Sequence, residues 1–452
     1  MRHALPRAPQ IRPRRVDVAG AALIAAALVL AGWCDRSTAA TAAAPTPDTA
    51  QAAASPLRLG VYRATLTLPG GELPFGLEIE REHAAYVAYL INGPERVRVP
   101  EVAVTASRVD MHMPGYLNQL TANISGDSLD GSVTLVKSGG RKQVIPFKAQ
   151  HGLQYRFLAT PAGAHVDFSG RWAVTFTDET GASEKSVGEF RQTQQHVTGT
   201  FLAPSGDHRY LAGEAQGDQL MLSAFDGAHA LLYRAHLDQH GALSGILWSG
   251  LASKENFSGM RDANASLGDA ERATAMRGAA RKLDFSFADL DGKSVSLTDK
   301  RFRDKVVIVT LAGSWCPNCH DEAAFLAPYY LRNRARGLEV VSLMFERYGD
   351  LPQALAATKR FRAEYGIRYT TLIAGVSDRD DAAKKLPQLN GVFAFPTTIF
   401  VDRQGAVRQI HTGFSGPATG AHYEKLKHDF KATVEQLLAE SARRGDTHAP
   451  AG

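Results

Sequence analysis

The residues best suited to chemistry are Cys316 and Cys319, in a segment that reads Trp-Cys-Pro-Asn-Cys-His-Asp-Glu from Trp315 to Glu322. The segment follows a buried-strand pattern at residues 306–311 and begins a helical pattern. A cysteine at a helix N-terminus faces unpaired backbone N–H groups and the positive end of the helix dipole, so its thiolate is favoured. We therefore expect Cys316 to be the nucleophile and Cys319, about one turn later, to resolve a mixed disulfide.

The cysteine count supports a redox role over a structural one. The chain has three cysteines, and Cys34 lies in an N-terminal targeting pattern, which leaves only the pair in the body of the protein. A bridge between cysteines three positions apart closes a minimal loop and removes little entropy from the unfolded chain. Pro317 suits the first helical turn, where its missing N–H has no intrahelical acceptor.

A second element lies 80 residues after Cys316, where Phe395-Pro396-Thr397 directly precedes a strand pattern. Together with the cysteine pair, this element resembles the thioredoxin superfamily, and residues 283–405 resemble its exported TlpA-like or ResA-like reductase branch. The resemblance implies an α/β thioredoxin fold in which Pro396 is cis and lies beside the cysteines, at an energetic cost of about 0.5–1 kcal/mol. Trp315, Pro317 and Thr397 are candidate supporting residues.

The sequence departs from cytoplasmic thioredoxins six residues before the first cysteine, where Thr310 replaces a buried acid. Threonine cannot act as a base near neutral pH, so another group must handle protons. Glu322 matches a glutamate of the reductase branch and is our candidate, although a first-turn glutamate also complements the helix dipole. His320 could instead stabilise a thiolate, or it could be an ordinary surface histidine.

The N-terminal residues carry most of the positive charge. The formal net charge is +5, and six arginines against two aspartates in the first 40 residues leave the remainder at +1. This balance does not favour nucleic acid as a partner. An apolar run at residues 18–33 follows the arginines and is shorter than the ~20 residues of a bilayer-spanning helix, so residues 1–34 are interpreted as a signal peptide or membrane anchor. Residues 35–56, rich in Ala, Thr and Pro, form an expected linker.

Residues 57–262 show short β-type runs, at 61–68, 86–91, 108–113 and 132–136, and a weak internal duplication. Gly60-Val-Tyr62 echoes Gly170-Arg-Trp172, and Leu-Asp-Gly-Ser-Val at 129–133 echoes Leu-Ser-Gly-Ile-Leu at 243–247. We predict two all-β, barrel- or sandwich-like domains, at 57–160 and 161–262. Aromatic residues of the second copy would pack inside it or line a cavity: Trp172, Phe176, Phe190, Phe201 and Trp248. The histidines of this region lack metal-ligand spacing, so we expect surface or turn positions for them.

After residue 262 the pattern changes. Residues 263–281 have a helical composition and are a predicted connector, residues 282–442 alternate strands and helices and predict a mainly parallel sheet, and 443–452 are a predicted flexible tail.

The function that these residues predict is exported thiol-disulfide exchange, in the periplasm or cell envelope, soluble or tethered by the N-terminus. We expect disulfide-containing protein substrates, a membrane thiol electron donor, and no cofactor other than the redox-active disulfide itself. Three alternatives stay open. The C-x-x-C-H pattern at residues 316–320 also attaches c-type haem, the fold suits a peroxiredoxin-type peroxidase, and the β-domains suit a ligand- or partner-binding protein with an accessory thioredoxin domain.

Overall fold

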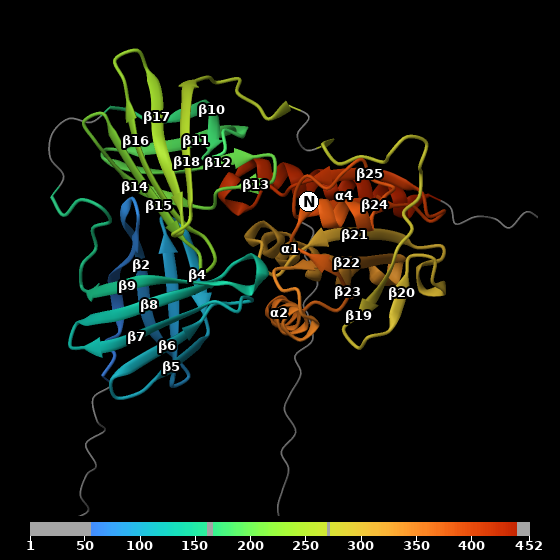
Figure 1. Ribbon diagram of the computed structural model, residues 1–452, viewed down its shortest axis with the longest axis horizontal. Helices are drawn as coiled ribbons and strands as arrows, with labels where there is room; N and C mark the ends of the chain where they lie inside the picture. Colours follow the sequence, from blue (N-terminus) through green and yellow to red (C-terminus); the bar gives the residue numbers. More distant parts are fainter. Residues whose placement is uncertain (1–55, 161–165, 269–271, 441–452) are drawn as a thin grey trace, which may run out of the picture. The chain divides into compact units, whose positions relative to one another are not determined.

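The computed structural model describes residues 56–160, 166–268 and 272–440 (Figure 1). The predicted signal peptide with Cys34, nearly all of the predicted linker and the predicted tail lie outside these ranges. Among the described residues, no helix has the length and apolar character needed to cross a bilayer.

The first β-region forms one nine-stranded antiparallel sheet in the order β4-β3-β2-β1-β9-β8-β7-β6-β5. The two ends of this order, β4 and β5, are consecutive in the chain and separated only by Pro100, so the sheet curls back toward itself and is barrel-like. Its strands are β1 (Gly60–Leu68), β2 (Gly71–Glu82), β3 (Ala85–Asn92), β4 (Glu95–Val99), β5 (Glu101–Val104), β6 (Arg108–His112), β7 (Gln119–Ser125), β8 (Ser128–Val136) and β9 (Lys142–His151).

The second β-region forms another antiparallel sheet, in the order β11-β10-β18-β17-β16-β15-β14-β12-β13, and an additional pairing of β11 with β12 closes it. Closure removes exposed strand edges. The strands are β10 (Gly170–Asp178), β11 (Ser183–Thr193), β12 (His196–Ala203), β13 (Gly206–Asp207), β14 (Leu211–Gln216), β15 (Gln219–Phe225), β16 (Ala230–Leu237), β17 (Ala242–Ser249) and β18 (Ser253–Arg261).

The interior of this second barrel is aromatic. Phe176, Phe190 and Phe201 pack against one another in its core with Trp172, so barrel packing accounts for these side chains. His208 contradicts the expectation of surface histidines, because its ring packs against Phe176 and Phe201 and its Nδ1 lies 2.5 Å from the Tyr233 hydroxyl. Burial lowers the pKa of His208 to about 4.

The sequence echoes occupy equivalent places in the two sheets. Gly60 and Gly170 begin β1 and β10 with φ of 107° and 108°. Two residues later, Tyr62 Oη donates to the Arg58 carbonyl at 2.9 Å, and Trp172 Nε1 donates to the Phe168 carbonyl at 3.0 Å. Each ring therefore ties the start of its sheet to the carbonyl four residues earlier, which supports an internal duplication.

The second echo also has a structural reason. Gly131 in β8 and Gly245 in β17 each lie against the backbone of the preceding strand. A Cβ at Gly245 would lie 2.5 Å from the Arg234 carbonyl oxygen, and one at Gly131 would clash with the Thr121 carbonyl oxygen. The repeated glycine thus permits close strand approach in both sheets.

We predict that Gly131→Ala and Gly245→Ala each lower the free energy of unfolding by about 1–3 kcal/mol, because the added methyl group forces neighbouring strands apart. Gly349→Ala is the control, since a Cβ there meets nothing within 4 Å. Urea titrations followed by circular dichroism measure the difference. Equal stability of all three variants and the parent would show that close approach is not why glycine occupies these positions.

The two β-domains share apolar and polar contacts. Phe225 and Leu232 of the second barrel belong to the same buried cluster as the core of the first. Asn92 pairs with the backbone of Phe225 through both its amide nitrogen and its oxygen, at 2.9 and 3.0 Å. Arg156 joins this contact by donating to the Asn92 side chain and to Ser223.

The C-terminal domain contains a seven-stranded sheet in the order β20-β19-β23-β22-β21-β24-β25. Only the three central strands are parallel, so the prediction of a mainly parallel sheet was wrong. The pairs β19–β20 and β24–β25 are joined by short turns, which force an antiparallel arrangement. The strands are β19 (Ser286–Asp289), β20 (Ser294–Ser296), β21 (Val306–Ala312), β22 (Leu338–Glu346), β23 (Thr370–Val376), β24 (Thr397–Val401) and β25 (Val407–Thr412).

Helices cover this sheet and carry the chemistry-bearing segment. They are α1 (Pro317–Asn333), α2 (Leu351–Glu364), α3 (Arg379–Lys385) and α4 (Ala421–Ala439). Aromatic contacts of Phe325 and Tyr329 with Phe430 pack α1 against α4. Strand β21, α1, β22 and α2 lie where the sequence pattern predicts them.

The prediction that residues 263–281 form a helical connector was wrong. The described residues of 263–281 contain no α-helix, and Met276 instead forms an isolated β-bridge with Leu389. The Arg277 N–H donates to the Gln388 carbonyl at 2.7 Å, and the Asn390 N–H donates to the Ala275 carbonyl at 2.9 Å, so residues 275–277 lie along the C-terminal domain. These long-range hydrogen bonds outweigh the modest helix propensity of the segment.

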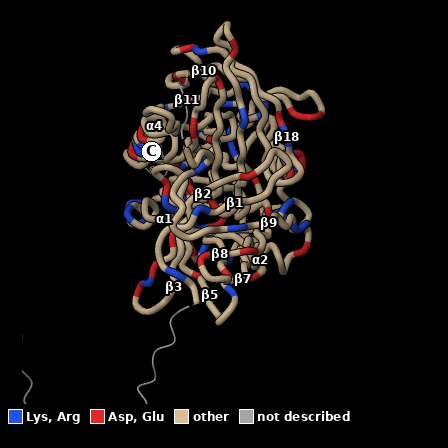
Figure 2. Tube along the Cα trace, turned by 90° about the vertical axis from the view of Figure 1, so that its left-hand side faces the viewer, with Lys and Arg blue, Asp and Glu red and all other residues tan. Residues whose placement is uncertain are grey.

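The charge pattern of the folded body agrees with its nearly neutral total. In Figure 2 lysine and arginine positions are interspersed with aspartate and glutamate positions over the described trace. Exposed pairs such as Arg96 with Glu78 and Glu80 contribute to this mixture.

Candidate active site

Cys316 and Cys319 form a disulfide at the start of α1, with their Cα atoms 5.2 Å apart. Cys316 is the N-cap residue, and its Sγ accepts a hydrogen bond from the Cys319 N–H at 3.2 Å. Pro317 is the first helical residue, as predicted from its missing N–H. In the reduced protein the same N–H and the helix dipole would favour a thiolate at Cys316.

The Phe-Pro-Thr element lies against the disulfide. The Phe395–Pro396 peptide bond is cis, as the family resemblance implied. The carbonyl oxygen of Phe395 lies 3.3 Å from Cys316 Sγ, and Thr397 begins β24, which pairs with β21. The fold therefore brings together residues that are about 80 positions apart in the sequence.

Trp315 and Ser314 are held by the end of β22. The Trp315 Nε1 donates to the Phe345 carbonyl at 2.8 Å, and its ring contacts Phe395 edge-on. Ser314 donates from both its backbone N–H and its hydroxyl to the carboxylate of Glu346, at 3.1 and 2.7 Å. These contacts fix the turn between β21 and the cysteines.

Glu346 is a buried acid that the sequence did not reveal. Burial raises its pKa, against the hydrogen bonds donated by Ser314 and by Thr358 of α2. Its position as the last residue of a buried strand, facing the turn before the cysteines, was the only available signal. An ordinary, solvent-exposed glutamate can also end a buried strand. The sequence alone therefore could not show that Glu346 is buried.

Glu322 lies three residues after Cys319 on α1 and is buried, with 2% of its surface exposed. Thr398, the second residue of β24, donates a hydrogen bond to Glu322 Oε1. Burial raises the pKa of Glu322 to about 7, and the Thr398 hydrogen bond offsets part of that rise. A carboxyl with this pKa can both accept and release a proton near neutral pH. Glu322 is buried, so an interaction with the helix dipole alone does not explain why a glutamate occupies this position.

His320 differs from both expectations made for it. Its side chain is neither at the surface nor a cation, because burial lowers its pKa to about 3. Nε2 lies 2.8 Å from the Ser314 carbonyl and must donate, so Nδ1 accepts from the Tyr365 hydroxyl at 2.8 Å. His320 therefore supports the structure as a neutral imidazole. Among the described residues, no cluster of His, Cys, Asp and Glu side chains has an arrangement that could hold a metal ion.

Comparison with known proteins identifies this domain. Residues 278–426 match the Redoxin family. The ResA thiol-disulfide oxidoreductases of Bacillus thuringiensis subsp. konkukian and Bacillus subtilis are 27% and 23% identical over 125 and 151 residues, which are 28% and 33% of this chain and 64% and 72% of theirs. The chain thus spans less than two thirds of the length of the first relative.

Solved structures align with somewhat more than a third of the chain. A thioredoxin-family thiol:disulfide interchange protein from Chlorobium tepidum is 22% identical, with 36% of this chain and 99% of that one covered and a TM-score of 0.28. A secreted thiol-disulfide isomerase from Corynebacterium glutamicum is 22% identical, with 37% and 92% covered and a TM-score of 0.29.

A disulfide at a helix N-terminus beside a cis-proline loop defines a thioredoxin-fold redox domain. The C-terminal domain resembles the thioredoxin superfamily in this arrangement, and the sequence of the chain is similar to the ResA thiol-disulfide oxidoreductases. The resemblance inferred from the cysteine and Phe-Pro-Thr motifs is thereby confirmed.

We predict that Glu322→Gln changes how stability depends on pH. Because the pKa of Glu322 in the folded protein, about 7, exceeds its ordinary value of 4.5, folding binds a proton between these values. The stabilisation is complete at low pH and is lost as the pH rises through 7. Glutamine avoids this loss, so from pH 5 to pH 8 the variant should gain up to about 3 kcal/mol relative to the parent.

Urea unfolding of the oxidised proteins at the two pH values measures this gain. Glu179→Gln, at an exposed turn of the second barrel, is the control and should not change the pH dependence. A constant difference between Glu322→Gln and the parent at both pH values would contradict the raised pKa.

Proposed function

We propose that this protein is a thiol-disulfide oxidoreductase that reduces disulfide bonds in other proteins. The observation that carries the proposal is the disulfide itself, at the N-cap of α1 and 3.3 Å from the carbonyl that precedes cis-Pro396. A helix N-terminus lowers the pKa of a thiol and so prepares Cys316 for attack. The similarity to proteins named thiol-disulfide oxidoreductase supports the same activity.

In the proposed reaction the Cys316 thiolate attacks one sulfur of a substrate disulfide. A mixed disulfide forms and one substrate thiolate leaves. The Cys319 thiolate then attacks Cys316 Sγ, which releases the second substrate thiol and forms the Cys316–Cys319 disulfide. The substrate gains two electrons, and a thiol donor must return the protein to its reduced form. Glu322 would take the proton that Cys319 loses, since its pKa is about 7.

The proposal includes an exported location, in the periplasm or cell envelope, with the protein soluble or tethered by its N-terminus. Reduction in an oxidising compartment requires electrons from elsewhere, so a membrane thiol donor is the expected partner. That no cofactor is needed besides the disulfide also stays a prediction.

The haem alternative is disfavoured by the geometry around the C-x-x-C-H motif. Both sulfurs are joined to each other, and both ring nitrogens of His320 are engaged, with Ser314 and Tyr365. Covalent haem attachment would require both sulfurs, and iron ligation would require one of these nitrogens. No observation favours a peroxidase or a ligand-binding function over disulfide exchange.

We predict that Cys316→Ser reduces insulin disulfides no faster than the uncatalysed reaction, because serine supplies no thiolate. Cys319→Ser should instead accumulate a mixed disulfide with the substrate, visible as a mass increase that dithiothreitol reverses. Cys34→Ser is the matched control and should keep the parent rate. Undiminished insulin reduction by Cys316→Ser would exclude the proposed nucleophile.

We also predict that the Cys316–Cys319 couple is reducing. Its potential, measured by equilibration with glutathione or dithiothreitol redox buffers, should lie nearer to about −270 mV, typical of thioredoxin, than to about −120 mV, typical of a strong oxidant. A potential of about −120 mV would instead indicate that the protein oxidises its substrates, by the same thiol-disulfide exchange.

A further inference from the structure

The redox pair is almost completely covered. Only 4% of Cys316 and 1% of Cys319 is exposed, and Pro317, Asn318 and Phe395 are also buried. The small cavity beside the turn that precedes the cysteines, lined by Ser314 and Trp315 but by neither cysteine, has a volume of about 20 Å³, room for about one water molecule. A protein disulfide therefore cannot reach Cys316 in this arrangement.

Part of the cover is the tip of a hairpin in the second barrel, formed by β12, residues 204–205 and β13. Asp207 ends β13, and its Oδ1 accepts hydrogen bonds from Asn318 Nδ2 at 3.0 Å and from the Gly416 N–H at 2.6 Å. Asn318 is one of the two residues between the cysteines, and it also donates to the Phe414 carbonyl at 3.2 Å. The second barrel thus bonds directly to the redox motif.

The hairpin tip fits closely against this face. A Cβ at Gly206 would lie 2.6 Å from Cγ of Asn318, and a Cβ at Gly413 would lie 2.5 Å from the Pro204 carbonyl oxygen. Gly413 follows β25 and donates its N–H to the Pro396 carbonyl. Residues 204–207 therefore lie along both the cysteine motif and the loop that supports cis-Pro396.

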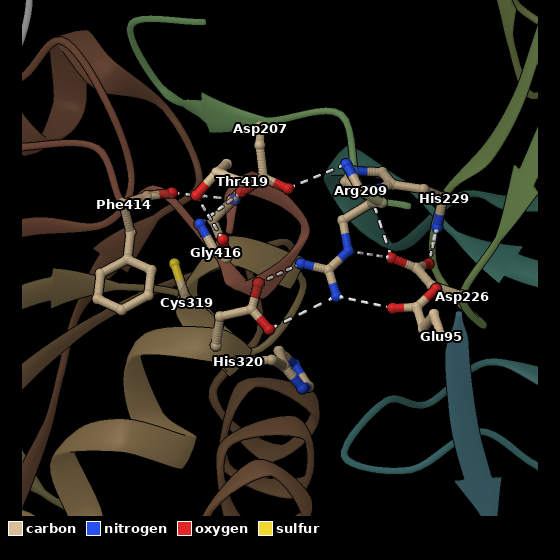
Figure 3. Close-up of polar contacts among 12 residues, drawn as sticks. Glu95, Asp207, Arg209, Asp226, His229, Cys319, His320, Phe414, Gly416 and Thr419 are labelled. Carbon is tan, nitrogen blue, oxygen red and sulfur yellow. Dashed lines mark hydrogen bonds and ion pairs between the residues drawn. The ribbon is translucent and has the colours of Figure 1, made fainter. Parts of the chain in front are cut away.

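Arg209, two residues beyond Asp207, joins all three domains (Figure 3). Its guanidinium donates to Asp321 of α1, and it forms ion pairs with Asp226 of the second barrel at 2.9 Å and with Glu95 of the first at 3.4 Å. All four side chains are at most 13% exposed. We call this group the Arg209 cluster.

The Arg209 cluster contains more acid than base. Arg209 faces Glu95, Asp226 and Asp321, Asp207 adds a fourth carboxylate, and His229 lies 3.6 Å from Asp226. Burial raises the pKa of Glu95 to about 7 and of Asp321 to about 6, although Arg209 lowers both. Loss of the Arg209 guanidinium would therefore leave the buried carboxylates at this contact uncompensated.

The first barrel covers the other side of the motif. The Tyr116 ring stacks on His320, with centroids 3.9 Å apart, and Arg347 beside Trp315 donates to the Val136 carbonyl. Arg360 of α2 forms an ion pair with Glu101 at 3.0 Å, but this pair is more exposed. Exposed pairs contribute little to stability, so the Arg209 cluster is the main polar connection.

We propose that residues 204–209 are an internal partner that occupies the docking face of the redox site, and that the Arg209 cluster holds them there. This inference rests on the proposed function for its meaning, since the covered face is the one that a substrate disulfide must reach. Exchange then requires the second barrel to move away from α1, and partner proteins must compete with the hairpin tip. The apparent affinity for a partner is lowered by the fraction of molecules that are closed.

The test is the rate at which dithiothreitol reduces the Cys316–Cys319 disulfide in the full-length oxidised protein. The reaction is quenched with iodoacetamide, and the reduced fraction is read from the mass increase. We expect the parent protein to react at least tenfold more slowly in its native state than in urea. Arg209→Gln should remove most of that protection, because it leaves the facing carboxylates unpaired.

Gly206→Ala provides a second route to the same result without changing charge. Its methyl group would push against Asn318, so the native rate should again rise toward the rate in urea. The matched control is Gly217→Ala, another glycine of this barrel with positive φ, where a Cβ meets nothing within 4 Å. Arg156→Gln, whose contacts are with Asn92 and Ser223, controls for loss of a buried arginine. Both controls should react at the parent rate.

Two outcomes would overturn the proposal: a parent protein that reacts as fast natively as in urea, or Arg209→Gln and Gly206→Ala proteins that fold and yet react at the parent rate. If Arg209→Gln fails to fold, as judged by circular dichroism, the Gly206→Ala comparison decides. The measurement does not require turnover of a protein substrate. If an uncovered variant, once reduced to its Cys316/Cys319 dithiol, still fails to reduce insulin, that result counts against the proposed function and not against the cover.

Discussion

The site depends on one constraint, which is that the first turn of α1 leaves backbone N–H groups without helical partners. Cys316 satisfies one of them by accepting from Cys319 N–H, so the group that completes the helix is also the sulfur that would react. The turn before it is fixed by Ser314 on Glu346, and the loop beside it by cis-Pro396. Helix capping, thiol reactivity and the two neighbouring loops therefore all constrain the position of Cys316 Sγ. A change in any one of these contacts would alter the others.

Local sequence patterns predicted much of the C-terminal domain because several of its elements are specified by a few neighbouring residues. The apolar run of β21, the N-terminal position of Pro317 and the proline before β24 are all readable from neighbours in sequence. The mixed sheet was mispredicted because strand direction depends on connection length at the edges. The connector was mispredicted because Met276 gains a strand partner at Leu389, which lies far away in the sequence.

The electrostatic surroundings of the site could not be predicted in the same way. Glu322 was a candidate through family resemblance, but its raised pKa results from burial under β24 and a hydrogen bond from Thr398. Arg209 and Asp207 lie more than 100 residues before the cysteines and belong to a different domain. No periodicity or spacing links them to the motif, because their meeting is a property of domain packing.

Asn318 belongs both to the local cysteine motif and to the contact between domains. A residue between the paired cysteines influences their redox properties, so its choice would ordinarily reflect electron transfer alone. Here its amide also donates to Asp207 and to the Phe414 carbonyl, within 2.6 Å of where a Cβ on Gly206 would lie. A replacement at Asn318 would therefore change the redox couple and the fit of the hairpin tip together. Asn318 therefore meets two structural requirements, its place between the cysteines and its hydrogen bond to the second barrel, and a thioredoxin domain without such a cover would impose only the first.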